Sequence, residues 1–144
     1  MLLRALTTVA VLALIGRPAG ARCDEFCSCN WERDPVKAKE AASVVVSGAA
    51  LDSTLTAPRV VDRVRETYEV RVVVRDRWKG NVPDTVMVHT TDPGGGCGFW
   101  FERGQQYLLF LHRDSAGALW ATMCSLSQPL SKADSVVRAL GHPS

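Results

Sequence analysis

Five cysteines constrain the fold of this chain more than any other feature of its sequence. Cys23, Cys27 and Cys29 lie close together near the N-terminus, whereas Cys97 and Cys124 lie far along the chain. In an exported domain such a set is most simply a disulfide framework with one cysteine left over. Cys27 and Cys29 are too close in an extended segment to bond each other without strain, so each is expected to bond a distant cysteine. The pairing itself stays open at this point.

A metal site is the competing interpretation of the closely spaced Cys27 and Cys29. A structural zinc centre normally has spaced pairs of cysteine or histidine, whereas His89, His112 and His142 stand alone along the chain. Disulfides are therefore favoured over a metal. We predict that the chain has no metal of its own and no cofactor.

The N-terminus predicts that the chain is exported. A single positive charge, Arg4, precedes an uncharged apolar run over 5–16, which is too short to span a bilayer. Pro18 breaks this segment, and residues 19–21 read Ala-Gly-Ala, the small-x-small pattern that signal peptidase accepts. Residues 1–21 are therefore predicted to be a signal peptide.

The remaining residues, 22–144, are predicted to form one secreted or periplasmic domain. Arg22 stands where a lipoprotein signal needs a small residue before Cys23, so lipidation is not expected. No later stretch approaches the roughly 20 apolar residues of a membrane helix. The sequence leaves the oligomeric state open.

Charge gives no support for a nucleic-acid partner. The chain has 17 Lys and Arg against 15 Asp and Glu, and Arg4 and Arg17 leave with the signal peptide while no acidic residue does. The exported domain is therefore expected to carry no net charge. One strand carries a basic stripe, which is interpreted as a solvated face of the sheet: Arg71, Arg75, Arg77 and Lys79.

Alternating apolar residues predict a mainly β fold. The clearest strand covers 68–78, where one face is apolar and the other is charged. The apolar face consists of Tyr68, Val70, Val72, Val74 and Trp78. The other predicted strands are 44–50, 85–90, 106–112 and 119–123, and 52–59 is predicted to be a polar loop.

A short helix is predicted at each end of these strands. Asp34 and Pro35 suit the cap and first position of a helix that ends near Ser43, and a final helix is expected to begin at Ser131 with Asp134 as its capping partner. This order of elements predicts a closed or partly closed five-stranded antiparallel barrel of the oligonucleotide/oligosaccharide-binding type, stapled by disulfides.

No enzyme active site is predicted. His89 and Asp92 lie near a strand end without the pattern that surrounds a catalytic nucleophile, and the glycines of 94–96 are followed by a cysteine and an aromatic strand instead of a helix. The large rings of Trp31, Trp100 and Trp120 are expected to fill the core or to cover the ends of the barrel.

A set of short motifs, in a fixed order, resembles the netrin-like module of tissue inhibitors of metalloproteinases, as a divergent or bacterial-type member. The motifs are Cys27-Ser28-Cys29, the strand 43–48, Tyr68-Glu69-Val70, Trp78-Lys79-Gly80, Cys97-Gly98-Phe99, Tyr107-Leu108-Leu109 and Thr122-Met123-Cys124-Ser125. The resemblance covers nearly all of 27–140.

The resemblance implies a five-stranded barrel with the disulfides Cys27–Cys97 and Cys29–Cys124. It also implies an inhibitory ridge made of Cys27, Ser28, Cys29, Gly96 and Cys97. In that family the free amine and carbonyl of the first cysteine bind the protease zinc, and the next residue enters the specificity pocket. These roles fall here on Cys27 and Ser28.

The chain departs from the family just before Cys27. Residues 22–26 are predicted to remain after cleavage, so the nitrogen of Cys27 is an amide, whose delocalised lone pair does not ligate zinc. Two hypotheses follow. The domain is a protein-binding module that inhibits a zinc metalloprotease, or it is a structural or interaction module of the cell envelope or extracellular space without inhibitory activity.

Overall fold

The computed structural model describes residues 27, 29–30, 32–56, 67–92 and 97–144. The predicted signal peptide and Cys23 lie outside these residues. The elements, in chain order, are α1 (Pro35–Ala41), β1 (Val44–Thr56), β2 (Thr67–Lys79), β3 (Thr85–Thr91), β4 (Gln106–Arg113), β5 (Leu119–Trp120), β6 (Gln128–Pro129), the 3₁₀ turn η2 (Leu130–Lys132) and α2 (Asp134–Leu140).

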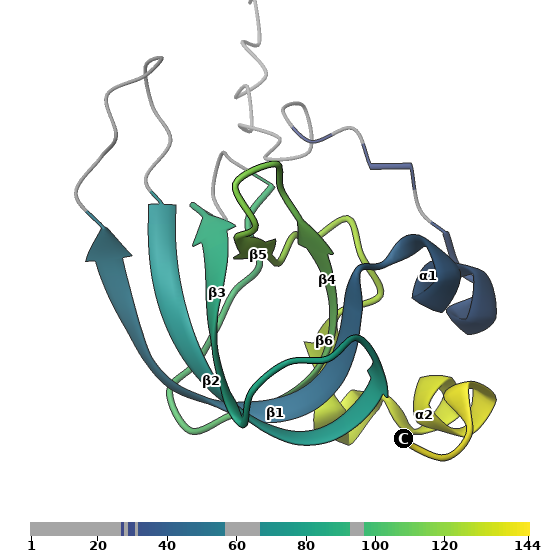
Figure 1. The fold of residues 1–144 in the computed structure, drawn as a ribbon. Coiled ribbons are helices and arrows are strands. Elements are labelled where there is room, and N and C mark those ends of the chain that lie inside the picture. Colours follow the sequence, from purple (N-terminus) through teal and green to yellow (C-terminus); the bar gives the residue numbers. More distant parts are fainter. Residues whose placement is uncertain (1–26, 28, 31, 57–66, 93–96) are drawn as a thin grey trace, which may run out of the picture.

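Five strands close into a barrel in the order β1-β2-β3-β5-β4, because β1 pairs with β2 on one side and with β4 on the other (Figure 1). β6 adds a short ladder to the first part of β4. The mainly β, five-stranded closed barrel with a short helix near each end is the predicted architecture.

One ladder differs from the predicted antiparallel arrangement. β3 and β5 run parallel, with Val88 opposite Leu119 and His89 opposite Trp120. Every other pair of neighbours in the ring is antiparallel. A closed ring with an odd number of strands cannot alternate direction all the way round, so at least one parallel pair is unavoidable.

The interior of the barrel is filled mainly by aliphatic side chains from all five strands and from two connections, those of Val82 and Ala121. They include three fully buried valines, Val46, Val70 and Val88, and the central pair Leu109 and Leu111. These residues alternate along their strands with outward-facing ones, as the period-two pattern of the sequence predicts. Burying such branched side chains completely contributes roughly 1.5–3 kcal/mol each.

A second apolar cluster lies outside the barrel, between β1, β4 and the helices. Figure 1 shows α1 and α2 together on one side of the barrel. The helices cover Val45, Leu108 and Phe110, so β4 is buried on both faces and its sequence is apolar over five consecutive residues. The carboxylate of Asp34 caps α1 by accepting from the backbone N–H groups of Val36 and Lys37, as predicted.

Trp78 belongs to this second cluster and not to the face of Val74, where the alternation places it. The register between β1 and β2 shifts at three places, and the shift between Ser47 and Gly48 leaves Arg75 as an extra residue of β2 between Val74 and Trp78. A bulge adds one residue to a strand and reverses the face of every residue after it. Trp78 therefore turns outward under α2, where its indole N–H donates to the carbonyl of Gly141 at 2.8 Å.

Three element boundaries differ from the prediction. β1 continues to Thr56 through the predicted polar loop, because β2 offers it partners from Arg71 back to Thr67. β5 is shorter than predicted and ends at Trp120. Ser131 lies in the 3₁₀ turn η2 instead of capping the last helix, and α2 begins at Asp134 without a side-chain cap.

No helix in the described part of the chain is long and apolar enough to cross a membrane.

Candidate functional site

Two disulfides fasten the start of the described chain to the rest of the domain. Cys27 bonds Cys97 and Cys29 bonds Cys124, with Cα–Cα distances of 5.5 and 5.1 Å. This is the pairing that the family resemblance implies. Disulfides persist in oxidising compartments, so they indicate an extracytoplasmic environment.

The two bridges attach to neighbouring segments of backbone. Gly98 forms an isolated antiparallel bridge with Thr122, and the N–H of Met123 donates to the carbonyl of Cys97 at 3.0 Å. Cys97 has a φ of 58°, which is uncommon for a residue with a side chain. The two receiving segments, 97–98 and 122–124, are hydrogen-bonded to each other, and we call them the paired edge. Cys27 and Cys29 are therefore held side by side against this paired edge.

Gly98 lets this edge sit directly on the end of β3. A Cβ atom on Gly98 would lie 1.7 Å from the carbonyl oxygen of Thr91, which no real contact allows. The neighbouring N–H of Phe99 donates to the hydroxyl of Thr90 at 2.7 Å, and Thr90 is buried. A glycine and a buried threonine thus fix the position of the disulfide-bearing segment on the barrel.

The structure brings together Cys27, Cys29 and Cys97 of the predicted ridge. Ser28 and Gly96 lie outside the described residues, so the ridge as a whole stays a prediction. The predicted glycine loop of 94–96 and Trp31 also lie outside them.

Two exposed apolar side chains stand beside the disulfides. Trp100 is 65% exposed and Met123 is 41% exposed, and both line a groove of about 640 Å³ that also includes Tyr107 and Pro129. The expectation that Trp100 fills the core is therefore wrong. The run Phe99-Trp100-Phe101 carries the missed signal, because alternate residues of an extended segment point to opposite sides and its two phenylalanines pack on the core.

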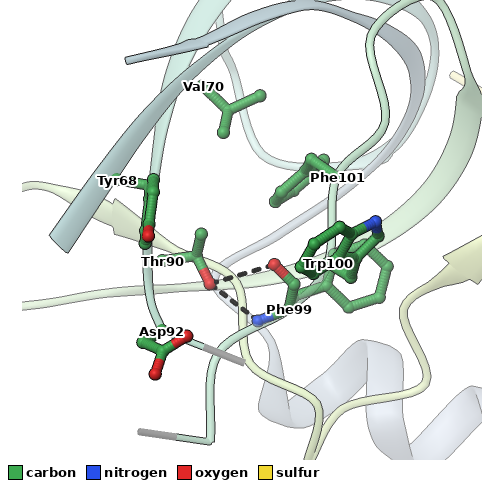
Figure 2. Close-up of a pocket in the computed structure, with 7 residues that line it drawn as sticks. All are labelled: Tyr68, Val70, Thr90, Asp92, Phe99, Trp100 and Phe101. Atoms are coloured by element: carbon green, nitrogen blue, oxygen red, sulfur yellow. Dashed lines mark hydrogen bonds between the residues drawn. The ribbon is translucent and has the colours of Figure 1, made fainter. Parts of the chain in front are cut away.

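A smaller, aromatic pocket opens on the other side of Trp100. It has a volume of about 160 Å³ and is lined by Tyr68, Val70, Thr90, Asp92, Phe99, Trp100 and Phe101. Figure 2 shows Tyr68 and Asp92 on one side of this pocket and Trp100 and Phe101 on the other. Sequence reasoning missed it because its walls come from three separate segments, β2, the end of β3 and residues 99–101, whose contact depends on the tertiary fold.

Three aromatic rings next to the pocket pack against one another edge to face. The rings of Phe99, Phe101 and Tyr107 meet in pairs at centroid distances of 4.9, 5.4 and 5.2 Å. The Tyr107 hydroxyl accepts from the backbone N–H of Glu102 at 2.8 Å, and burial raises the pKa of this phenol. The aromatic segment is therefore anchored to β4 by both ring contacts and a hydrogen bond.

The basic stripe on β2 is occupied by local partners. Each cation interacts with an acid or a carbonyl: Arg71 with Asp52, Arg75 with Asp76 at 3.9 Å, Arg77 with Asp84 at 2.7 Å, and the Lys79 ammonium with the carbonyls of Lys39 and Glu40. The hydrogen bond from Arg71 lowers the pKa of Asp52. This arrangement supports the interpretation of the stripe as a solvated face.

Trp120 and His89, which are paired in the parallel ladder between β3 and β5, both make side-chain contacts. The indole N–H of Trp120 donates to the Asp114 carboxylate at 2.8 Å, and this hydrogen bond is the main cause of the lowered pKa of Asp114. His89 packs on the Trp120 ring and lies 3.8 Å from a Glu69 oxygen. Among the residues that the structure describes, no three metal-ligating side chains gather at one point.

No protein-family model and no curated protein matches the chain. The structure shows a disulfide-containing five-stranded β-barrel and assigns no family. Its geometry offers one candidate interaction surface, which consists of the disulfide-held Cys27 and Cys29, the groove with Trp100 and Met123, and the aromatic pocket.

Proposed function

We propose that this protein is an exported protein-binding module of the netrin-like, inhibitor-related type. It binds its partner through the predicted ridge and the apolar groove beside it. The single observation that carries this proposal is the double disulfide attachment of Cys27 and Cys29 next to the exposed Trp100 and Met123.

A surface held in this way is suited to binding a protein. The two bridges and the paired edge restrict the ridge before any partner arrives, so association loses little conformational entropy. Tryptophan and methionine are enriched at protein interfaces, and an exposed tryptophan that serves no core role is a typical anchor residue. The groove, which Trp100 and Met123 both line, provides apolar area for such contact.

Inhibition of a zinc metalloprotease is the specific form of this proposal. It requires a free α-amine on Cys27, because an amine has the lone pair that a metal needs and an amide does not. Trimming of residues 22–26 would create that amine. Ser28 would then enter the specificity pocket of the protease, and no metal of the module's own is involved.

The second form is an interaction module of the envelope or extracellular space that does not inhibit. The sequence retains five residues between the predicted cleavage point and Cys27, and this observation favours the second form. In that case binding depends on Trp100 and Met123, whereas the state of the Cys27 nitrogen is irrelevant.

The deciding experiment compares two N-terminal forms of the protein against a panel of zinc metalloproteases. The form that begins at Cys27 is expected to inhibit at least one of them, and the form that begins at Arg22 is expected to be much weaker. Chemical acetylation of the Cys27 amine is the matched control, because it removes the metal ligand without adding residues. Replacement of Ser28 by leucine is expected to change which protease is inhibited.

Absence of inhibition by both forms across the panel would reject the inhibitor form. The interaction form is tested by capture of proteins from the native extracytoplasmic fraction. The double change Trp100→Ser and Met123→Ser is expected to abolish capture of a specific protein. Met87→Ser is the control, because Met87 is equally exposed, at 42%, but lies on β3. Equal capture by both variants would contradict the proposal.

Export is tested separately by N-terminal sequencing and intact-mass measurement of the secreted protein. We expect a first residue of Arg22, two disulfides and no lipid. A diacylglycerol on Cys23 would contradict this expectation.

A further inference from the structure

The aromatic pocket has the size and walls of a site for one side chain. Its volume is about 160 Å³, and an apolar protein cavity of about 150 Å³ is known to hold a single benzene ring. Tyr68, Phe99 and Phe101 are only partly buried around it, and Trp100 is exposed. These rings therefore leave a space open at the surface instead of closing it by packing on one another.

The walls of the pocket are fixed independently of any ligand. Thr90 is 3% exposed, and its hydroxyl accepts from the N–H of Phe99 while lying 3.4 Å from the Phe99 carbonyl (Figure 2). Val70 closes the inner end of the space as a fully buried residue of the barrel core. Phe101 is held by edge-to-face contacts with Phe99 and Tyr107. A preformed pocket of this kind binds without the cost of reorganising its walls.

The chemistry of the walls favours a cation. The faces of tryptophan, tyrosine and phenylalanine rings carry negative electrostatic potential and attract ammonium and guanidinium groups. Asp92 contributes the one charged side chain among the described residues that line the pocket, and it is a carboxylate. In Figure 2, Asp92 lies below Tyr68 on the same side of the space and across from Trp100. A cation placed between them would contact rings and carboxylate together.

The neighbouring groove lacks this bias. It is lined by both an acidic residue, Glu102, and a basic one, Lys132, among mostly uncharged residues. Counting only the described lining residues, the groove has one charge of each sign, whereas the pocket combines aromatic faces with one carboxylate. Trp100 lines both, so a ligand in the pocket lies next to a protein bound in the groove.

We infer that the aromatic pocket bounded by Tyr68, Trp100 and Asp92 receives a basic side chain, arginine or lysine, of the protein partner. The basic head group lies between the rings near Asp92, and the aliphatic stem passes over Phe99 and Phe101. That the occupant belongs to a protein rests on the proposed function, but the preference for a cation can be measured without the partner.

The test measures binding of three small probes by ¹⁵N–¹H NMR of the folded, oxidised protein. The probes are the Nα-acetyl methylamides of arginine, lysine and norleucine, the last being an uncharged analogue of the lysine stem. With NaCl holding the ionic strength constant, arginine and lysine are expected to shift the Thr90 and Phe99 amides and the Trp100 indole saturably, with dissociation constants on the order of 1–10 mM. Norleucine is expected to bind at least fivefold more weakly.

Two variants locate the effect. Asp92→Asn is expected to weaken binding of both cationic probes by about fivefold, the factor that corresponds to about 1 kcal/mol for a partly exposed ion pair. Trp100→Leu keeps an apolar side chain at an exposed position and removes an aromatic face, so it is expected to weaken binding by about two- to fivefold. Asp84→Asn is the matched control, because Asp84 is an exposed carboxylate that pairs with Arg77 away from the pocket.

The inference is overturned if norleucine binds as tightly as the cations, which would make the pocket a purely apolar site. It is overturned equally if the cationic probes cause no saturable shifts, or if Asp84→Asn weakens binding as much as Asp92→Asn. Failure of the proposed function is distinguishable from these outcomes, because it appears as a missing protein partner while cation binding by the pocket persists.

Discussion

Removal of one disulfide at a time tests whether the two bridges together close one small ring in the unfolded chain. Taken alone, the two bridges close loops with sequence separations of 70 and 95 residues. While both are present, however, each closes a much smaller ring in the unfolded chain. That ring runs from Cys27 to Cys29, across the other bridge, and from Cys124 back to Cys97, which is about 30 residues.

The loss of either bridge is therefore expected to cost the same free energy of unfolding. For a ring of about 30 residues the chain-entropy relation gives about 3.5 kcal/mol, and removal of the second bridge then costs about 4.5 kcal/mol because its loop is longer. For a domain of roughly 120 residues the first loss corresponds to a fall in melting temperature of about 10–15 °C.

The measurement is urea unfolding followed by circular dichroism under non-reducing conditions. The paired variants are Cys27→Ala with Cys97→Ala, Cys29→Ala with Cys124→Ala, and all four changes together. Equal losses for the two single removals support the shared ring. A loss below about 1 kcal/mol for one removal and a large loss for the other would refute the reasoning, because it would mean that only one bridge restrains the unfolded chain.

Two further predictions concern the support of the paired edge and of the barrel. Gly98→Ala is expected to destabilise the domain by about 3 kcal/mol, because the added Cβ atom would overlap the Thr91 carbonyl. Gly104→Ala is the control: no atom lies within 4 Å of its added Cβ, so it should cost only the roughly 1 kcal/mol of a left-handed backbone. Comparable urea midpoints for the two variants would contradict this prediction. Asp114 has a folded-state pKa below its ordinary value of 3.8, so its contribution to stability is complete above that pH and is lost as the pH falls through the folded-state pKa. The difference in unfolding free energy between the native protein and Asp114→Asn should therefore be constant above about pH 5 and shrink below pH 4, and a difference that does not change with pH would disprove this role.

Much of the barrel could be predicted because local patterns determine it. The alternation over β2 as far as Val74 and the Asp34 cap depend on near neighbours in the sequence, and they appear as predicted. The outward turn of Trp78 could not be predicted, because a bulge changes the register without changing the composition around it. The extension of β1 was missed for a related reason. Its polar residues are stabilised by a partner strand, as Asp52 is by Arg71.

The candidate site could be predicted only in part. Sequence spacing limits the partners of Cys27 and Cys29 to two distant cysteines, but it does not decide between the two pairings, because both receiving segments are adjacent in space. The exposure of Trp100 and the aromatic pocket depend on how β2, the end of β3 and the segment 99–101 meet in space. Tryptophan is highly buried on average, but this average does not predict whether one particular tryptophan, such as Trp100, is exposed.

The parallel ladder between β3 and β5 has a consequence for how the barrel opens in its native state. Within the ring, each of the two ladders of β5 contains two residue pairs, whereas every other ladder contains at least six. Local opening follows the path that breaks the fewest contacts, so exchange of backbone amides with solvent should be fastest where β5 detaches. Cys124 follows β5 by four residues and ties that strand's exit to Cys29. Reduction of this one bridge is therefore expected to let the closed ring become an open sheet more often, and the unpaired edges of an open sheet associate readily with other chains.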